Sequence, residues 1–340
     1  MIRYGIFGAG WRAEFYLRLA SLCPETFRVA GIYIRNPETR KKYENSPFPV
    51  FDTAEGLLAV LDKEHDFIVS CVKKTAMAAV VTELARDGWA VLSETPAGVT
   101  HEESAALAAL GETGARVQVA EQFHFQPLLA AVKAVVERGY IGKVTQLQLS
   151  LCHDYHAVSL MRFFLGTGLE KPEIRTFLLP DPVTEYNGRP GRKEPILNDG
   201  KSRLSLLRFG EKSALYDFCQ TQYFSDIRSS SFLLRGENGE IRFEDCRYLK
   251  GNVPHHFRLE RKAYGANGDL DGYYLSEITG NGEVFYENPF PGARLSDEEI
   301  AIGTCLLRMK DYIETGKEFY SLRDAAFDAE VAMEMGENIQ

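Results

Sequence analysis

The segment from residue 2 to residue 22 constrains the fold more than any other part of this chain. An apolar run over residues 2–7 leads directly into Gly8-Ala9-Gly10-Trp11-Arg12-Ala13, and a helical pattern follows over residues 14–22. The six residues match G-x-G-x-x-G/A. In this motif the first glycine permits a tight turn, the second lets the backbone approach a pyrophosphate, and the last residue keeps helix and strand close. Because a helix N-terminus offers amide hydrogens to an anion, the segment predicts a dinucleotide-binding turn that uses Gly8, Gly10, Trp11 and Arg12.

The first third of the chain continues this alternation of apolar strands and helices. Strands are expected at 28–34, 67–72, 90–93 and 117–120, and helices at 37–44, 76–86 and 102–112. Strands that are apolar along their whole length are typical of a parallel sheet covered on both faces. Residues 1–122 are therefore predicted to form an NAD(P)-binding, Rossmann-type doubly wound α/β domain.

The pattern changes from residue 123 onward. A helix is expected at 127–138, and the strand predicted at 144–151 alternates apolar and polar residues, so one face of its sheet should be wetter than the other. Further strands are expected at 202–209, 213–219 and 230–244, the last broken by a hairpin at 237–240. These features predict a C-terminal α+β domain, residues 123–340, with a large, mainly antiparallel open sheet for substrate binding and oligomerisation.

The stretch 180–201 is rich in proline and glycine and is expected to be a long loop. Its segment Asn187-Gly188-Arg189-Pro190-Gly191-Arg192-Lys193 would suit an anionic ligand if it folded over a site, although charged loops are usually only solvated.

Composition narrows the classes of partner. The chain has 340 residues and a formal charge of -9, which argues against nucleic acid as a partner. The sequence has no apolar run long enough to cross a membrane and no opening typical of a signal peptide, so a cytoplasmic location is expected. The six cysteines form no C-x-x-C pair, which favours reduced thiols in the core over disulfides or a zinc site.

In an open parallel sheet, ligands bind beyond the carboxyl ends of the strands. The second strand ends in Arg35-Asn36, with no carboxylate to hold a ribose 2'-hydroxyl, and a guanidinium can grip a 2'-phosphate. The sequence thus favours NADP over NAD, unless Arg35 only stacks on adenine or faces water. The other predicted cofactor contacts at strand ends are Val72, Lys73, Lys74, Glu94, Thr95 and Gln122.

Several longer segments together resemble the Gfo/Idh/MocA family, the glucose-fructose oxidoreductase and inositol dehydrogenase relatives. The resemblance is carried by the Gly8-Ala9-Gly10 turn and by residues 88–96, 121–127, 139–144 and 156–166. It implies a Rossmann domain followed by an open sheet, hydride exchange between a nicotinamide and a sugar, cyclitol or related polyol, and a homodimer or homotetramer formed through that sheet.

Three departures from the family's pattern affect the expected chemistry. The family's E-K-P lysine, whose ammonium touches the reacting hydroxyl, is Thr95 here, and a threonine hydroxyl supplies no positive charge. The family's histidine and aspartate, three residues apart, appear as His156 and Ser159. The family's T-P-N-x-x-H segment is replaced by residues 72–77, which lack the histidine and add Lys73 and Lys74.

The strand before His156 passes almost directly into its helix, so that His153, Asp154, Tyr155 and His156 lie together at one turn. Histidine titrates near neutral pH and suits proton transfer to or from a hydroxyl. We therefore predict His156 as the acid/base, Asp154 or Tyr155 as its orienter or proton relay, and Lys73 as a replacement for the missing positive charge. His153 and His156 lack a third ligand, so no metal is expected. His255 and His256 should point to opposite faces of a strand and not serve one site.

Three functions stay open at this point. The first is an NAD(P)-dependent oxidoreductase acting on CH-OH groups. The second is a redox-neutral, NAD-dependent lyase or glycosidase that retains its cofactor. The third is a nucleotide-binding regulator without turnover, which the loss of the lysine at Thr95 would permit.

Overall fold

The computed structural model describes residues 1–189, 191–265 and 272–339, and it divides the chain into two compact units, each discontinuous in sequence. Unit 1 comprises Met1–Pro127, Arg261–Glu277 and Glu287–Glu330, and unit 2 comprises Leu128–Glu260, Ile278–Tyr286 and Val331–Gln340. The division into an NAD(P)-binding domain, residues 1–122, and a substrate-binding and oligomerisation domain, residues 123–340, stays a prediction.

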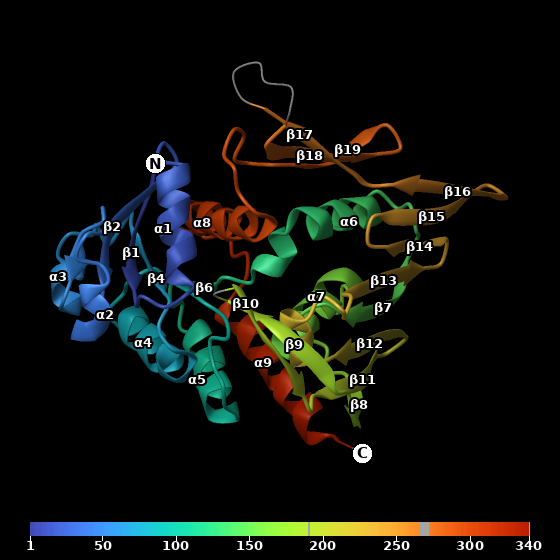
Figure 1. Cartoon of the computed structure of the whole chain (residues 1–340), viewed down its shortest axis with the longest axis horizontal. Coiled ribbons are helices and arrows are strands. Elements are labelled where there is room, and N and C mark those ends of the chain that lie inside the picture. Colours follow the sequence, from blue (N-terminus) through green and yellow to red (C-terminus); the bar gives the residue numbers. More distant parts are fainter. Residues whose placement is uncertain (190, 266–271, 340) are drawn as a thin grey trace. The chain divides into compact units, whose positions relative to one another are not determined.

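Unit 1 is built on a six-stranded parallel sheet, which confirms the predicted doubly wound α/β fold (Figure 1). The strand order is β3-β2-β1-β4-β5-β6, so the chain reverses direction across the sheet between β1 and β4. A reversal of this kind leaves a crevice at the carboxyl ends of the two strands. The strands are β1 (Ile2–Phe7), β2 (Phe27–Tyr33), β3 (Val50–Phe51), β4 (Phe67–Ser70), β5 (Val91–Ser93) and β6 (Val117–Val119).

The helices of unit 1 include one from the far end of the chain. Helix α8 packs against α1, and Gly303 of α8 makes the close approach possible, since a Cβ there would lie 2.7 Å from the Phe290 ring and 3.3 Å from Leu19. The helices are α1 (Ala13–Leu22), α2 (Pro37–Lys41), α3 (Ala54–Leu58), α4 (Lys74–Arg86), α5 (His101–Gly111) and α8 (Asp297–Thr315), with a 3-10 turn η1 (Gln122–Phe125).

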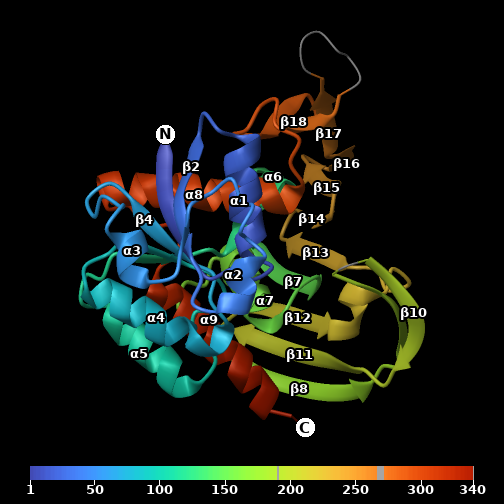
Figure 2. The same cartoon turned by 60° about the vertical axis from the view of Figure 1, so that its left-hand side comes forward.

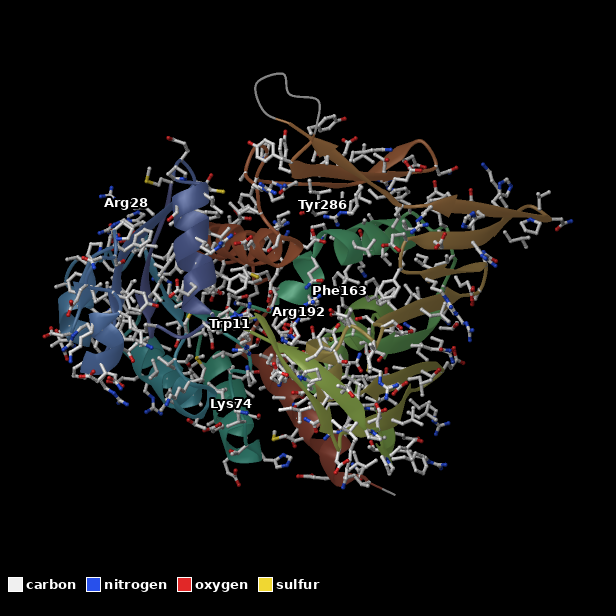
Figure 3. The ribbon with its side chains drawn as sticks, in the orientation of Figure 1. Trp11, Arg28, Lys74, Phe163, Arg192 and Tyr286 are labelled. Carbon is white, nitrogen blue, oxygen red and sulfur yellow. The ribbon has the colours of Figure 1, made fainter. Side chains whose placement is uncertain are left out.

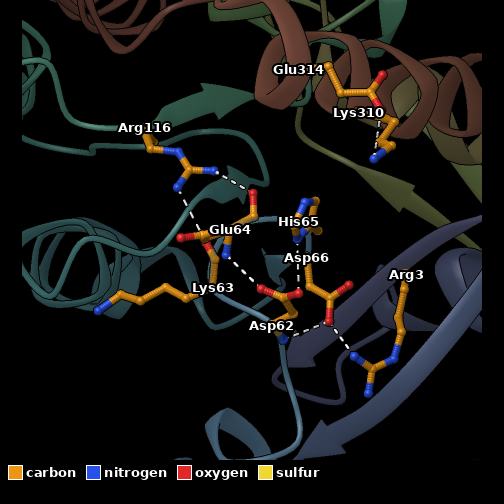
Figure 4. Close-up of polar contacts among 9 residues, drawn as sticks. All are labelled: Arg3, Asp62, Lys63, Glu64, His65, Asp66, Arg116, Lys310 and Glu314. Atoms are coloured by element: carbon orange, nitrogen blue, oxygen red, sulfur yellow. Dashed lines mark hydrogen bonds and ion pairs between the residues drawn. The ribbon is translucent and has the colours of Figure 1, made fainter.

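A polar network ties together the amino-terminal ends of the strands of unit 1 (Figure 4). Arg3 of β1 forms an ion pair with Asp66, just before β4, and the Asp62 backbone N–H donates to the same carboxylate at 2.8 Å. Arg116, just before β6, donates to the carbonyl oxygens of Lys63 and Glu64 at 3.3 and 3.4 Å. These contacts occupy the end of the sheet opposite to the crevice.

Unit 2 contains a mixed, mainly antiparallel eight-stranded sheet, as predicted (Figure 2). The order is β16-β15-β14-β13-β7-β12-β11-β8, and only the β7–β12 pair is parallel among the ladders recorded for these strands. The strands are β7 (Val144–Ser150), β8 (Glu173–Pro180), β11 (Lys201–Phe209), β12 (Lys212–Phe218), β13 (Ser231–Gly236), β14 (Gly239–Arg242), β15 (Asp245–Lys250) and β16 (Val253–Arg258).

The two faces of this sheet differ, as the alternation in the sequence predicts. Val144, Leu147 and Leu149 of β7 are buried, and α7 packs on β7 and β12. On the other face, Phe177, Leu179 and Leu206 are 42, 47 and 48% exposed. The helices of unit 2 are α6 (Pro127–Glu137), α7 (Asp154–Leu165) and the 3-10 turn η2 (Gln220–Phe224), while α9 (Leu322–Glu337) passes from unit 1 into unit 2.

The prediction of a long loop at residues 180–201 is wrong. Strands β9 (Val183–Gly188) and β10 (Gly191–Asn198) form an antiparallel hairpin there, and Pro190 lies outside the described residues. The hairpin tolerates the residues that suggested a loop. Gly191 adopts φ +117° beside the turn, and the pairing register shifts between Arg192 and Ile196, around Pro195.

The remaining strands, β17 (Glu260–Tyr264), β18 (Tyr274–Gly280) and β19 (Glu283–Glu287), form a three-stranded sheet that the sequence did not indicate. All six cysteines are buried and none forms a disulfide, in agreement with the predicted core thiols.

Candidate functional site

The glycine turn after β1 has the geometry that its motif predicts. Gly8 adopts φ +98° and donates its N–H to the Tyr33 carbonyl at 3.0 Å, and a Cβ at this position would lie 2.7 Å from the Cys71 carbonyl oxygen. At Gly10 a Cβ would meet nothing closer than that oxygen at 3.8 Å, so the glycine borders open space. Gly8 therefore closes the turn, and Gly10 leaves room for a ligand at the start of α1.

Trp11 and Lys74 lie at or just before the starts of the two helices that follow β1 and β4. Trp11 is 42% exposed just before α1, and Lys74 is the first residue of α4 (Figure 3). Lys73 caps α4 without a side-chain hydrogen bond to the helix, both lysines are exposed, and Val72 is half-buried. The carboxyl end of β4 thus presents two cations to solvent.

Arg12 is engaged by carboxylates of its own unit. Its Nη1 donates to Oε1 of Glu298 at 2.7 Å, its Nε lies 3.4 Å from Oε2 of Glu94, and the guanidinium stacks over the Trp11 ring at 4.4 Å. Burial lowers the Arg12 pKa, but the two carboxylates outweigh this and leave the pKa raised. The sequence placed Arg12 and Glu94 at strand ends correctly, although it gave no sign of Glu298, which lies in the first turn of α8.

Glu94 is the centre of a buried polar cluster. The carboxylate is 4% exposed and accepts a 2.5 Å hydrogen bond from the Tyr16 hydroxyl and a 3.3 Å bond from the Thr95 N–H. Burial, with the Glu94 charge beside it, raises the pKa of Tyr16 well above its usual value. Tyr16 therefore stays a neutral donor that holds Glu94 in place.

The end of β6 supplies two further buried polar side chains. Glu121 accepts from the Phe123 N–H at 3.2 Å, and burial raises the pKa of its carboxyl well above the usual range. Gln122 is 2% exposed, and its Oε1 is buried without a hydrogen-bond partner among the described residues. An unsatisfied buried acceptor is costly, so this oxygen fits a site that a donor from a ligand completes.

The end of β2 carries one more cation than the sequence suggested. Arg35 is exposed, and Nη1 of Arg40 donates to the Ile34 carbonyl at 3.1 Å, which brings a second guanidinium to the same corner. Asn36 accepts from the Glu38 and Thr39 N–H groups at 2.8 and 3.3 Å and so caps α2. The Asn-Pro pair at 36 and 37 is a recognisable helix-start signal, and it could have indicated this capping role.

In unit 2, Asp154 is the first residue of α7, and its side chain contacts two residues of the sheet. Its carboxylate forms an ion pair with Arg203 of β11 and accepts from the Tyr216 hydroxyl at 2.8 Å. That hydroxyl also donates to the Cys152 carbonyl at 3.1 Å, and burial raises the Tyr216 pKa. Asp154 is thereby fixed to the sheet, and Arg203 and Tyr216 are functional candidates that the sequence did not single out.

The residues around Asp154 form an aromatic group. The His153 ring lies 4.8 Å from the Tyr223 ring, and the His153 N–H donates to the Tyr223 hydroxyl at 3.0 Å. The Tyr155 ring lies 4.3 Å from the ring of His156, which is 4% exposed, and Ser159 one turn later is 1% exposed. Unit 2 thus brings together the predicted residues 154–156, whereas Lys73 belongs to unit 1.

Neither a metal cluster nor a membrane-spanning helix occurs in the described ranges. Within residues 1–189, 191–265 and 272–339, no group of three or more His, Cys, Asp or Glu side chains could hold a metal ion. Across the same residues, no helix is both long and apolar enough to span a bilayer.

Comparison with known proteins identifies the fold. No protein-family model matches the sequence, and the search of curated proteins found no match. An oxidoreductase from Agrobacterium radiobacter, solved with NAD+, L-tartaric acid and magnesium, superposes with a TM-score of 0.69 at 16% identity, covering 99% of this chain and 96% of its own. A levoglucosan dehydrogenase solved with NADH and L-sorbose gives 0.68 at 16% identity, with 99 and 96% covered.

A protein described as a transcriptional regulator, Gal80p from Kluyveromyces lactis, is also similar, with a TM-score of 0.66 at 14% identity and 99 and 92% of the two chains covered. At such identities these likenesses establish the fold alone. They confirm the two-part architecture implied by the resemblance of the sequence.

Proposed function

We propose that this chain is a Gfo/Idh/MocA family member that binds a nicotinamide dinucleotide and exchanges a hydride with a CH-OH group of a sugar, cyclitol or related polyol. The observation that carries the proposal is the turn at Gly8 and Gly10, where one glycine is required by the backbone and the other faces open space at a helix N-terminus. The shared fold and the unsatisfied Gln122 oxygen support it.

In this proposal the residues of unit 1 hold the cofactor. The backbone at Gly10 and the start of α1 would take the pyrophosphate, and Gln122 would accept a hydrogen bond from the carboxamide of the nicotinamide. Val72, Lys73, Lys74 and Thr95 would line the same crevice. Arg12 and Glu94 would shape the crevice through their ion pair, and Asn36 would act through the α2 cap rather than by contact.

We further propose that NADP is preferred over NAD. Arg35 and Arg40 lie at the end of β2, where the adenosine ribose is held in this fold, and two guanidinium groups suit a 2'-phosphate. Titration by reduced-nicotinamide fluorescence should show tighter binding of NADPH than of NADH. Changing Arg35→Ala and Arg40→Ala together should remove the difference, while Arg28→Ala, an exposed arginine at the start of β2, should preserve it. Equal affinities in the unaltered protein would contradict the preference without contradicting the function.

The cofactor, when bound, supplies or accepts the hydride, and side chains of the protein donate or accept the proton. We assign proton transfer to His156, whose ring centroid lies 4.3 Å from that of Tyr155, and we assign relay to Tyr155. Asp154 would position the start of α7 through Arg203 and Tyr216. Lys73 would stabilise the developing negative charge on the substrate oxygen in place of the lysine that Thr95 replaces.

Turnover tests these roles. Absorbance at the reduced-nicotinamide band, followed over a panel of polyols, sugars and sugar acids, should identify a substrate. With that substrate, His156→Asn should lower kcat at least about a hundredfold, with NADPH binding unchanged. A loss of less than about threefold would remove His156 from the reaction.

A second candidate is a nucleotide-binding regulator without turnover. Two observations favour it: Thr95 lacks the ammonium that the reaction uses in the family, and a transcriptional regulator shares the fold. A regulator would bind NADPH or NADH in the titration above and change no absorbance with any member of the panel.

We also propose a homodimer or homotetramer that forms through the exposed sheet face of unit 2. Phe177, Leu179 and Leu206 occupy neighbouring strands on that face, and each is more than 40% exposed. An apolar patch of this kind marks an association surface. Sedimentation equilibrium should show an oligomer that Leu206→Glu dissociates. Val253→Glu on β16 is the control, since Val253 is also an exposed apolar residue, at 57% against 48% for Leu206.

A further inference from the structure

Five rings form a row that runs from the start of α7 to the turn η2, all within unit 2. The ring centroids of His156 and Tyr155 are 4.3 Å apart, and those of Tyr155 and His153 are 6.2 Å apart. The Tyr223 ring lies 4.8 Å from that of His153 and 5.1 Å from that of Phe218. His156 and Phe218 are each 4% exposed, whereas Tyr223 is 42% exposed. This ring row therefore leads from the proposed acid/base to an aromatic face that is open to solvent.

The ring row lies on the face of the sheet that α7 covers, not on the face proposed for oligomerisation. In the pairing of β11 with β12, Leu206 lies opposite Leu215, and Arg203 lies opposite Phe218. Successive residues of a strand point to opposite faces, so Phe218 and Leu206 are on different faces of the sheet. A ligand on the ring row and a second copy of the chain at Leu206 would use separate surfaces.

Tyr223 is held in place on two sides. Its hydroxyl accepts a 3.0 Å hydrogen bond from the His153 N–H, and its ring meets the Phe218 ring edge to face, with 71° between the planes. The neighbouring Gln222 anchors η2, since its Oε1 accepts from the Cys219 N–H at 3.1 Å. An aromatic ring that is fixed before a ligand arrives loses little further freedom on binding.

The charged side chains at the start of α7 and directly after η2 are held in pairs. Arg203 forms an ion pair with Asp154, and Arg228 forms one with Asp181. Asp226 adds a third carboxylate, which accepts a 2.7 Å hydrogen bond from the hydroxyl of a β9 tyrosine. Carboxylates therefore outnumber guanidinium groups here when the histidines are neutral. A carboxylate or phosphate on a ligand would meet excess negative charge, which favours an uncharged ligand.

We propose that the ring row selects an uncharged, cyclic sugar or cyclitol, and that Tyr223 is a specificity-determining residue that contacts one face of its ring. The face of an aromatic ring carries partial negative charge and attracts the C–H groups that a cyclic polyol presents on one side. An acyclic polyol has no fixed face of this kind and must be ordered on binding. The inference rests on the proposed function, because His156 defines where the substrate lies.

Kinetics with the substrate panel test this selectivity. Among compounds of matched configuration, the uncharged cyclic form should have a kcat/KM at least about tenfold above those of the acyclic polyol, the uronic acid and the phosphate ester. Tyr223→Ala should raise the KM for the cyclic form at least about fivefold and change kcat less than about twofold, since the ring contact is made before and during the reaction alike.

Matched variants separate the ring contact from folding. Tyr223→Phe keeps the ring and loses only the hydroxyl that accepts from His153, so its KM should stay within about twofold of the original. Tyr223→Leu keeps apolar volume without an aromatic face, and it should raise KM as Tyr223→Ala does even if the alanine variant is unstable. Tyr264→Ala, at a 50% exposed tyrosine of unit 1, is the control and should leave KM unchanged. An unchanged KM in both Tyr223→Ala and Tyr223→Leu, or a preference for the acid, the phosphate ester or the acyclic form, would overturn the inference.

Saturation-transfer NMR distinguishes this inference from the proposed function, because it needs no turnover. With NADPH present, a cyclic polyol should receive saturation on its ring C–H protons in the unaltered protein and in Tyr223→Phe, but much less in Tyr223→Leu. That pattern without turnover of any compound would overturn the proposed oxidoreductase and keep the ring contact. Turnover with equal saturation transfer in all three proteins would keep the oxidoreductase and overturn the ring contact.

Discussion

Nη1 of Arg12 donates a 2.7 Å hydrogen bond to Oε1 of Glu298, and this contact joins the start of α1 to the first turn of α8 across 286 positions of sequence. Helix α1 begins directly after the glycine turn, and α8 begins beside Arg12, the residue that precedes α1. The pair therefore links the proposed pyrophosphate site to a helix that comes from the last sixth of the chain.

Removing the charge of Glu298 tests that link. Glu298→Gln keeps the shape of the side chain but weakens its hold on Arg12, so we expect a loss of about 1 kcal/mol of unfolding free energy. NADPH should bind several-fold more tightly, because a negative charge near an anionic cofactor is gone. Urea unfolding and fluorescence titration measure the two effects. Glu314→Gln, at the far end of α8, is the control. It should leave NADPH affinity unchanged and cost less than about 0.5 kcal/mol, because it breaks only the ion pair with Lys310 one turn away. No change in Glu298→Gln would mean that the pair with Arg12 is only a surface contact.

The two glycines of the turn should respond differently to alanine. Gly8→Ala meets both a positive φ and a carbonyl oxygen 2.7 Å away, so we expect a loss of more than about 3 kcal/mol in unfolding free energy. Gly114→Ala has φ +79° and nothing within 4 Å, so it should lose only about 1 kcal/mol, which is the backbone strain alone.

Gly10→Ala separates folding from binding. A Cβ at Gly10 makes only an ordinary 3.8 Å contact, so its melting temperature should stay near that of the unaltered protein. The methyl group would occupy the space proposed for the pyrophosphate, and we expect NADPH affinity to fall at least about tenfold. Unchanged affinity would argue that no dinucleotide lies against this turn.

The Asp154–Arg203 pair should show coupling in a double-mutant cycle. Asp154→Asn leaves Arg203 without its ion-pair partner, and we expect a loss of about 1–2 kcal/mol by urea unfolding, since both side chains are partly exposed. Arg203→Met alone should cost a similar amount, and the double variant should cost less than the sum of the two. Additive losses would show that the pair contributes no specific interaction.

Glu299, in the first turn of α8, should make the stability of the fold depend on pH. Burial raises its pKa, but the Ser296 N–H, which donates at 2.8 Å, and Arg18 outweigh this and hold the pKa below its usual value. A lowered carboxyl pKa stabilises the fold above the unfolded value of about 4.3, and the benefit is lost as pH falls through the folded value. Glu299→Gln should therefore cost about 1 kcal/mol at neutral pH, and this cost should shrink as the pH falls through the folded pKa of Glu299. Glu44→Gln, an exposed control, should be neutral over the same pH range.

Local patterns predicted the parts of this protein that depend on local physics. The apolar strands of unit 1 and the turn at Gly8 followed from residue type and spacing, because a buried parallel strand and a tight turn each restrict which residues can occupy them. Asp154 and His156 were correctly placed at one turn, since β7 and α7 are separated by only three residues.

Features that arise from tertiary packing were not predictable in this way. Nothing in the residues near Arg12 indicates Glu298, and nothing near Asp154 indicates Arg203, because these partners meet only when distant segments fold together. The hairpin β9–β10 was missed for a different reason. Proline and glycine usually mark loops, yet an exposed strand with an irregular register can contain both.

The position of α8 has a consequence for biosynthesis. A ribosome releases the six strands of the parallel sheet long before residues 287–330 leave its tunnel, and until then the surface of α1 that α8 covers stays open to water or to other proteins. The nascent chain should therefore depend on chaperones for most of its synthesis. A fragment ending at residue 122 should be prone to aggregation, even though its sequence contains every strand of the sheet.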